Sequence, residues 1–438
     1  MSSEICPECN QEYVVYYWCK PCNSKHFQND FNNWTSGNDK IDKLIQDEQL
    51  NANKYWEVIE WIPFERFNDV KQIGRGGFGT IHYAKWIDGF IKEWNIENQQ
   101  WNRYRKDEEV ALKKFDNFVN FNEVLNEIAI HLKTWTEYVA SIQFYGITQD
   151  PETHKYMMVL QYAKDGNLRE YLKINFNNID WKQKLGNLWY LSYKLMMIHK
   201  LDIVHQDFHP GNILSSNFKD YIQISDFGFS KLIGANPNSP EEKNIFGVLP
   251  YIAPEVLNGD EEYAKPADVY SFGIIAYEIV TGFPPYPDIP HDKNLAMKIC
   301  NGLRPKISFH TPKLITRTIM RCWDARVTHR PTFKELSVEL WKYYKDYDDY
   351  FYGGKNKDSE IVIQIKKAEE FSDNQESTNI TTRTPLNYQT HPQAIYTSRL
   401  LNYSNLPKTK NEENFERELE ELTKSMSNLC PSNSDLFI

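Results

Sequence analysis

A glycine-rich segment early in the chain has the composition of a phosphate-binding loop. It reads Gly74-Arg-Gly-Gly-Phe-Gly79-Thr-Ile81, and glycine lets backbone N–H groups approach phosphate oxygens without interference from a Cβ atom. The residues on both sides favour strands, so the loop would cover a nucleotide. A dinucleotide-binding fold would instead continue into a helix, and an ordinary glycine hairpin would need no ligand. The motif alone leaves these alternatives open.

Charged and amide side chains follow this loop at wide intervals. Lys113 lies on a predicted strand, and Glu127 lies on a predicted helix from which it could pair with Lys113. Asp207 and Asn212 come next, five residues apart, and Asp226 begins the segment Asp-Phe-Gly. Each residue alone could be an ordinary surface or turn residue. Their order along one chain favours a common function.

This order of motifs resembles that of the protein kinase superfamily. The resemblance covers residues 67–345, and the segment from Cys322 to Phe333 is similar to that of the tyrosine-kinase and tyrosine-kinase-like branches, of which we favour the tyrosine-kinase-like branch. A chance match over so many ordered motifs is negligible. Besides the loop and the five residues above, the matching segments are His205–Asn212, Ala253-Pro-Glu255 and Asp268–Gly273.

The resemblance implies an α+β fold with two lobes, a small β-rich N-terminal lobe and a larger helical C-terminal lobe. The apolar patterns along the chain agree with this expectation. Residues 86–110 are interpreted as an inserted hairpin. The patterns predict strands at 110–115, 141–147 and 156–161, and helices at 122–133, 185–199, 269–280, 316–322 and 333–344.

The resemblance also implies a role for each matched residue in the transfer of the γ-phosphate of ATP. This reaction spreads negative charge over phosphate oxygens, so the site needs metal ions and fixed positive charge. Lys113, oriented by Glu127, would hold the α- and β-phosphates. Asn212 and Asp226 would bind Mg²⁺ through oxygen atoms. Asp207 would accept the proton of the substrate hydroxyl or orient that hydroxyl.

Further residues are assigned to the nucleotide by the same resemblance. Leu160 takes the gatekeeper position, and Gln161–Ala163 take the hinge that would meet adenine. Glu255 is expected to pair with Arg330 beneath the activation segment, the stretch between Gly228 and Pro254. The residues expected to bind ATP are Gly74, Arg75, Gly76, Gly77, Phe78, Gly79, Ile81, Ala111, Lys113, Glu127, Leu160, Gln161 and Ala163.

Several positions depart from the family's pattern. Gln206 replaces an arginine that would receive a phosphate on the activation segment, where Ser239 is the best acceptor. His209 and Val248 stand where serine/threonine kinases usually have lysine and threonine, and the tyrosine-specific pattern is also absent. Val327 replaces a proline, which we interpret as a packing change. We predict an active protein kinase in intracellular signalling, with Ser/Thr favoured over Tyr.

Two alternatives remain. The departures would also suit a pseudokinase or scaffold that binds nucleotide and partners without turnover. The segment His209-Pro-Gly-Asn212 resembles the catalytic-loop sequence of small-molecule phosphotransferases such as aminoglycoside and choline kinases. Those relatives generally lack the motifs at 253–255 and 268–273, which argues against the second alternative.

Four of the seven cysteines lie in the first 22 residues. Cys6 and Cys9, and likewise Cys19 and Cys22, form Cys-x-x-Cys pairs, and a tetrahedral zinc ion takes four such thiolates. We predict a structural zinc module over residues 1–28, with a hairpin between the two pairs. His26 could replace one thiolate. Unligated thiols in a flexible leader are the alternative.

The remaining segments are assigned by composition. Residues 29–66 are expected to form a helical linker, with helical spacing between Ile41 and Ile59. Residues 346–438 are polar and rich in hydroxyl groups, so we expect a mostly disordered tail. An amphipathic helix at Phe415–Met426 would be its exception.

Net charge and hydropathy limit the kinds of partner that the chain is expected to bind. The net charge is −10, from 50 basic and 60 acidic residues, which argues against nucleic acid or an anionic membrane as a partner of the whole chain. No apolar run reaches the length of a spanning helix, and no secretory signal is visible. We expect an intracellular protein, cytoplasmic or nuclear, with a protein substrate and a possible protein partner at the zinc module or the tail.

Overall fold

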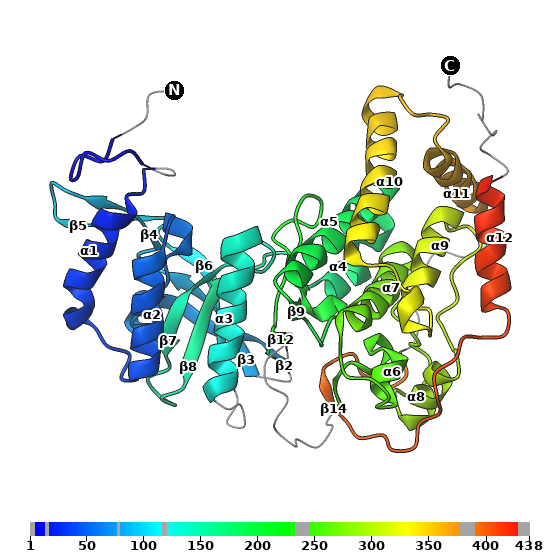
Figure 1. The fold of residues 1–438 in the computed structure, drawn as a ribbon, viewed down its shortest axis with the longest axis horizontal. Helices are drawn as coiled ribbons and strands as arrows, with labels where there is room; N and C mark the ends of the chain where they lie inside the picture. The colour runs from blue at the N-terminus through cyan, green and yellow to red at the C-terminus, as the bar shows by residue number, and fades with distance from the viewer. Residues whose placement is uncertain are drawn as a thin grey trace. The chain divides into compact units, whose positions relative to one another are not determined.

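The computed structural model describes residues 5–13, 17–76, 79–115, 121–228, 230–232, 245–376 and 390–427. The chain divides into two compact units, Met1–Ala163 and Lys164–Ile438 (Figure 1). Of the features predicted above, Gly77, Phe78, Ser239 and the middle of the hairpin between the cysteine pairs lie outside the described residues.

A six-stranded sheet forms most of the first unit. Its order is β1-β7-β8-β6-β3-β2, and neighbouring strands are antiparallel except β1 with β7. Val110 and Leu112 of the central strand are fully buried beside Trp86 and Val159. The predicted strands are confirmed. The bounds are β1 Glu60–Trp61, β2 Phe67–Gly76, β3 Gly79–Trp86, β6 Glu108–Phe115, β7 Phe144–Gln149 and β8 Tyr156–Gln161.

Three helices accompany the sheet. The predicted helix at 122–133 is confirmed as α3 (Phe121–Tyr138), which packs on β7. α1 (Lys20–Asp30) was not predicted, because its sequence has almost no amphipathic pattern. α2 (Asp39–Asn51) is shorter than the helical spacing up to Ile59 suggests. It ends where the carbonyl of Ala52 accepts a hydrogen bond from the indole of Trp18, 3.0 Å away.

The cysteine segment and the inserted hairpin share an aromatic core in the first unit. The hairpin is confirmed as β4 (Phe90–Asn95) and β5 (Gln100–Tyr104). Trp101 of β5 stacks on Phe27 of α1 with ring centroids 4.3 Å apart, and on Trp18 at 6.2 Å. Large buried aromatic rings contribute strongly to packing. The insertion is therefore part of the support for the cysteine segment, a contact that the sequence did not predict.

α7 (Lys265–Thr281) is the centre of the second unit and is buried along nearly its whole length. α5 and α9 pack against it, and α10 packs on α5. The four helices predicted in this region are confirmed. The other helices of the unit up to residue 353 are α4 Leu168–Asn175, α5 Trp181–Lys200, α6 Pro254–Leu257, α8 Lys293–Cys300, α9 Lys313–Cys322 and α10 Phe333–Gly353.

Short strands and 3-10 turns complete both units. The strands form two-stranded pairs, β9 with β12, β10 with β11, and β13 with β14. Their bounds are β9 Ile203–Val204, β10 Ile213–Leu214, β11 Gln223–Ile224, β12 Lys231–Leu232, β13 Ile245–Gly247 and β14 Arg399–Leu401. The 3-10 turns are η1 Phe31–Asn33, η2 Tyr55–Glu57, η3 Phe64–Arg66, η4 Phe176–Asn178, η5 Pro210–Asn212, η6 Leu249–Tyr251 and η7 Val327–His329.

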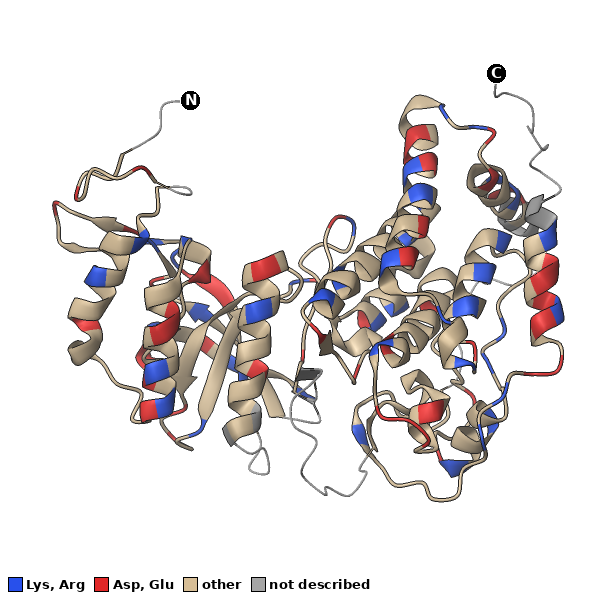
Figure 2. Cartoon of the chain, viewed as in Figure 1, with Lys and Arg blue, Asp and Glu red and all other residues tan. Residues whose placement is uncertain are grey.

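The tail after residue 345 is described over 346–376 and 390–427, and there it packs on the second unit. The predicted amphipathic helix is confirmed as α12 (Phe415–Ser427), which lies beside α9 and carries acidic and basic residues (Figure 2). A further helix, α11 (Glu360–Glu376), packs on α10. Ile361 and Ile365 are buried at this contact, which supplies the apolar burial that orders the segment. In the described part of the chain, no helix is both long and apolar enough to cross a bilayer.

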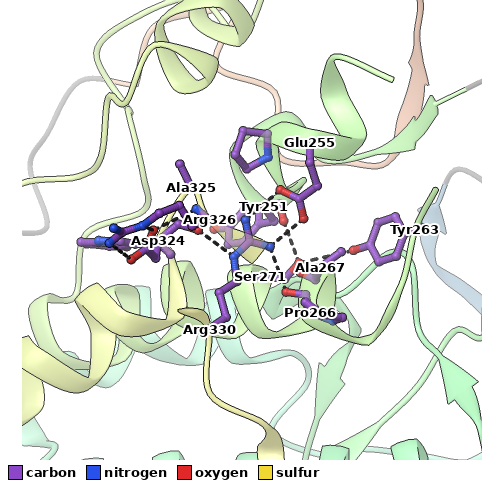
Figure 3. Close-up of polar contacts among 12 residues, drawn as sticks. Tyr251, Glu255, Tyr263, Pro266, Ala267, Ser271, Asp324, Ala325, Arg326 and Arg330 are labelled. Carbon is purple, nitrogen blue, oxygen red and sulfur yellow. Dashed lines mark hydrogen bonds and ion pairs between the residues drawn. The ribbon is translucent and has the colours of Figure 1, made fainter. Parts of the chain in front are cut away.

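The predicted pair of Glu255 with Arg330 is confirmed, and both side chains are buried. Two nitrogens of Arg330 donate to the two carboxylate oxygens of Glu255, at 2.6 and 2.7 Å (Figure 3). The guanidinium also donates to the carbonyls of Asp324 and Pro266. A bidentate arginine–carboxylate pair fixes geometry as well as charge. It joins the start of α6 to the segment before α10.

We expect Arg330→Ala to lower the free energy of unfolding by about 3–5 kcal/mol, because it leaves a buried carboxylate without its partner. Urea unfolding of the full chain measures this loss. Arg321→Ala is the matched control, since Arg321 pairs with Glu339 where both groups are partly exposed, and such pairs contribute about 0–1 kcal/mol. Equal losses in the two variants would contradict the structural role of the buried pair.

Candidate active site and metal site

The glycine loop joins β2 and β3 in the first unit. Gly74 lies opposite Ile81, and Gly76 lies opposite Gly79 at the end of the hairpin. Gly79 has φ +157°, and a Cβ atom there would lie 2.0 Å from the carbonyl oxygen of Lys114 on β6. A side chain at Gly79 would therefore collide with a backbone that cannot move without breaking the sheet. Glycine is required here by the approach of β6, independently of any ligand.

Lys113 and Glu127 form a buried ion pair in the same unit, as predicted. The Lys113 Nζ atom lies 2.5 Å from Glu127 Oε1, and the two side chains are 6% and 2% exposed. The strand register places Lys113 opposite Ile81 of β3 and Met158 of β8. Burying two opposite charges is costly unless their geometry is good. The position of α3 against the sheet is thus coupled to this contact.

The expected gatekeeper and hinge residues lie at the end of β8 and directly after it in the first unit. Leu160 lies opposite Ala111 of β6, and both Leu160 and Ala163 are nearly buried. The Gln161 N–H donates to the carbonyl of Gln143, at 2.9 Å. The first unit thus contains the glycine loop, Lys113 and the start of the hinge on neighbouring strands of one sheet, with Glu127 on α3.

The segment His205–Asn212, called the catalytic loop below, begins after β9 in the second unit. A carboxylate from α7 accepts hydrogen bonds from the backbone of this loop. Asp268 is fully buried. Its carboxylate accepts hydrogen bonds from the backbone N–H groups of His205, at 2.9 Å, and Gln206, at 3.3 Å, and contacts the ring of His199 at 2.9 Å. In the sequence, Asp268 is recognisable only as part of the motif at 268–273. Its contacts assign it the positioning of this loop.

The three predicted acidic and amide residues of the second unit are linked through backbone contacts. The Asn212 side chain donates to the carbonyl of Asp207, at 2.9 Å. The carbonyl of Asn212 accepts from the N–H of Ser225, at 3.0 Å, and Ser225 directly precedes Asp226. Asp226 has φ +65°, a conformation uncommon for residues other than glycine. Oxygen atoms of Asn212 and Asp226 are a donor set that suits Mg²⁺.

A residue from the tail reaches this group. Ser398 Oγ donates to Asp207 Oδ2, at 2.5 Å, and lies 3.1 Å from His209 Nε2. Asp207 and His209 are buried. Ser398 could not be predicted from the sequence, because a lone serine in a polar segment carries no local signal. Only the fold of the second unit brings these positions, 191 residues apart, together.

The four N-terminal cysteines converge in the first unit. Their Sγ atoms all lie within 4.8 Å of one another. Cys6 and Cys22 are 3.8 Å apart, and Cys9 and Cys19 are 3.5 Å apart. Four thiolates bound to zinc at about 2.3 Å in a tetrahedron would be separated by about 3.8 Å. The cluster is therefore consistent with a zinc site.

His26 belongs to a different contact. Its Nε2 atom lies 2.9 Å from Glu8 Oε1, and its ring stacks on Trp94 of the hairpin at 4.0 Å. Among the described residues, the group that could hold a metal ion consists of the four cysteines. The alternative in which His26 replaces a thiolate is not needed.

Comparison with known proteins assigns the class. Residues 67–340 match the family model of the protein tyrosine and serine/threonine kinases. This segment is more than half of the 438-residue chain. The chain therefore belongs to the protein kinase family. This family implies ATP as a substrate and Mg²⁺ as a cofactor.

The most similar curated proteins include kinases of three kinds. A protein of Acanthamoeba polyphaga mimivirus named as a serine/threonine-protein kinase/receptor, R826, is 28% identical over 66% of this chain and 16% of its own length. The tyrosine-protein kinase SPK-1 of Girardia tigrina is 27% identical over 65% of this chain and 54% of its own length. The dual specificity protein kinase pyk3 of Dictyostelium discoideum is 25% identical, over 70% and 21% respectively. The chain thus matches between about a sixth and about half of the length of these relatives.

We expect purified protein to contain one zinc ion per chain, measured by plasma mass spectrometry. Replacing Cys6 and Cys22 by serine should abolish this content, because it removes two of four thiolates. Replacing the buried Cys300 and Cys322 by serine is the control and should leave the zinc content unchanged. Zinc-free wild-type protein with four freely reactive N-terminal thiols would contradict the site.

The catalytic-loop histidine predicts a pH dependence of stability. Burial lowers the pKa of His205 below its ordinary value, so the unfolded chain binds a proton that the native state does not. Stability from this residue is therefore present above about pH 6.5 and lost as the pH falls, by up to about 1.4 kcal/mol per pH unit. We expect His205→Asn to lose less stability than wild type between pH 7 and pH 5 in calorimetry. Parallel curves for the two proteins would show that His205 titrates normally.

Proposed function

We propose that this protein is an active protein kinase that transfers the γ-phosphate of ATP to serine or threonine hydroxyl groups of proteins. The observation that carries the proposal is the buried ion pair of Lys113 with Glu127. In protein kinases this pair must be in place for the lysine to act on the α- and β-phosphates. A protein that neither binds nucleotide nor transfers phosphate would have no catalytic use for two buried opposite charges, whose desolvation is costly.

The second unit supplies the remaining groups of the proposed reaction. Asp207 would accept the proton of the attacking hydroxyl. Asn212 and Asp226 would hold Mg²⁺, which would supply positive charge to the phosphates. Asp268 keeps the catalytic loop in one conformation through its backbone hydrogen bonds. His209 stands in place of a lysine. The His209 Nε2 atom lies within hydrogen-bond distance of the Ser398 hydroxyl. This contact supports a role for the imidazole as a hydrogen-bond donor to the oxygen of the hydroxyl that accepts phosphate.

The geometry at Asp207 supports the preference for serine or threonine. The hydroxyl that contacts Asp207 belongs to a serine whose backbone adjoins β14. β14 is fixed by its pairing with β13. A tyrosine hydroxyl lies much farther from its own backbone, so a tyrosine on a strand at this distance would not fit beside Asp207.

We propose a structural role for the zinc. The four thiolates would fill a tetrahedral coordination shell and leave no open position for catalysis. Trp18 directly precedes Cys19, and it is buried against Phe27 and Trp101. The metal would thus hold the start of α1 and the aromatic core that joins it to the hairpin.

We expect Lys113→Met to reduce phosphate transfer at least about a hundredfold, because the phosphates lose a fixed positive charge. Transfer is measured as incorporation of labelled phosphate from ATP and Mg²⁺ into casein, myelin basic protein and the chain itself. Lys114→Met is the matched control, because the neighbouring Lys114 pairs instead with Asp150 at 3.0 Å. This variant should keep wild-type transfer.

A pseudokinase gives a different pattern in the same experiments. Wild type and Lys113→Met would then transfer equally little phosphate to every acceptor. ATP with Mg²⁺ would still raise the melting temperature of wild type, because a ligand that binds only the native state stabilises it. That combination would overturn the proposed activity. A peptide array then settles acceptor type, and exclusive labelling of tyrosine would overturn the Ser/Thr preference.

A further inference from the structure

The tail of the chain adds a strand to the activation segment of its own kinase domain. β14 pairs antiparallel with β13, with Leu401 opposite Ile245, Leu400 opposite Phe246, and Arg399 opposite Gly247. In Figure 1 this stretch of the tail is drawn in orange and passes close to α6 and α8. Extended peptides bind many proteins by adding a strand in this way, with backbone hydrogen bonds giving affinity.

Further contacts hold the tail before β14. The His291 N–H donates to the carbonyl of Gln393, at 2.9 Å, and Arg169 donates to the carbonyl of Tyr396, at 3.0 Å. The Tyr396 ring lies 4.6 Å from the Arg169 guanidinium, and its hydroxyl donates to the carbonyl of Pro285, at 2.8 Å. The backbone is thus fixed on both sides of Ser398.

The tail also continues along the unit after β14. The Lys410 N–H donates to the carbonyl of Cys300, at 3.0 Å. The Asn411 side chain donates to Asp324 Oδ1, at 2.8 Å, and accepts from the N–H of Ala325, also at 2.8 Å. The path of the tail over the second unit is therefore defined by specific contacts up to α12.

A glycine allows the tail to come this close to Asp207. Gly247 has φ +140°, and a Cβ atom there would lie 3.2 Å from Asp207 Oδ1. A side chain at 247 would occupy the space beside the carboxylate. Because Gly247 lies opposite Arg399, the preceding residue, Ser398, is brought to the carboxylate.

The hydrogen bonds at Ser398 have one consistent direction. The His209 Nδ1 atom accepts from the N–H of Gly211, at 3.0 Å, so the ring proton lies on Nε2. Nε2 then donates to Ser398 Oγ, at 3.1 Å. Ser398 must use its own proton toward Asp207 Oδ2, at 2.5 Å. A hydroxyl whose proton is directed at a carboxylate within hydrogen-bond reach is arranged for general-base catalysis.

We propose that Ser398 is a phosphorylation site that this kinase modifies on its own chain, an inference that rests on the proposed function. Ser398 Oγ attacks the γ-phosphorus of ATP, a new P–O bond forms, and the bond from that phosphorus to the β–γ bridging oxygen breaks. ADP leaves with the bonding electron pair. The hydroxyl proton passes to the Asp207 carboxylate, and the products are phospho-Ser398 and ADP.

Modification changes the fit of the tail. The unmodified tail occupies the position beside Asp207 and keeps the hydroxyls of other proteins away from it. Phospho-Ser398 carries a charge of about −1.5 to −2, and like charges repel when a phosphate is placed beside a carboxylate. The modified tail is therefore expelled from Asp207, which makes the step self-limiting and opens the acceptor position.

The test uses the full-length protein with ATP and Mg²⁺. Fragmentation mass spectrometry that separates neighbouring residues should place phosphate on Ser398, with a rate constant that is unchanged over a hundredfold dilution of the protein. Ser398→Ala should lack this phosphate. Thr397→Ala is the matched control, because Thr397 is an exposed neighbouring hydroxyl, and it should keep phosphorylation at 398.

Two further measurements separate reaction within one chain from reaction between chains. A tagged Lys113→Met chain mixed with wild type should stay unmodified at Ser398. Replacing Tyr396 and Arg399 by alanine should slow phosphorylation of Ser398 at least about tenfold. The Tyr396 side chain would lose its contacts with Arg169 and Pro285, and the Arg399 side chain would lose the hydrogen bond that it donates to the carbonyl of His291. The same double variant should also phosphorylate casein faster than wild-type protein that has not yet phosphorylated its own Ser398.

The outcomes distinguish this proposal from the proposed function. Labelled casein together with unmodified Ser398 would overturn the self-modification and leave the kinase activity intact. Modification of Ser398 on the tagged Lys113→Met chain would overturn reaction within one chain. Absence of labelled phosphate on casein, on the chain and on the double variant would overturn the kinase activity itself.

Discussion

The second unit depends on one buried carboxylate, that of Asp268. It has no exposure to solvent, and two backbone N–H groups and one imidazole surround it. A buried carboxylate without such partners would cost several kcal/mol, so the loop from His205 onward is held to the conformation that supplies them. Gln206 takes a positive φ to do so. The next residue is Asp207. Its carboxylate is oriented by the backbone conformation and the hydrogen bonds of the residues before it.

The departures from the family's pattern become understandable around this loop. Gln206 contributes its backbone N–H to Asp268, a contact that any side chain would allow. His209 is held by the N–H of Gly211 and presents Nε2–H to Ser398. A lysine at this position would present a charge on a flexible stem, whereas the imidazole presents a single donor in a fixed direction. The domain thus keeps a donor at this position with a different side chain.

Much of the fold and of the site followed from the sequence because the signals were local and ordered. The strands and helices of the catalytic domain have clear apolar periods, and the pairs Lys113–Glu127 and Glu255–Arg330 join positions fixed by separate motifs. Two features could not be predicted, for a physical reason. α1 has almost no amphipathic pattern and is stabilised by aromatic contacts with a hairpin about seventy residues away. β14 has only three residues, and its pairing with β13 depends on the fold of the whole unit.

The aromatic core beside the cysteines has a practical consequence. Trp18 and Trp101 stack on each other, and the imidazole of His26 lies 4.0 Å from Trp94. Indole emission is sensitive to stacking and to a nearby imidazole, and three of the chain's 12 tryptophans lie in this core. Part of the ultraviolet fluorescence of the chain would therefore change with the order of the thiolate cluster and would serve, without an attached dye, as an optical probe of zinc binding at the proposed site.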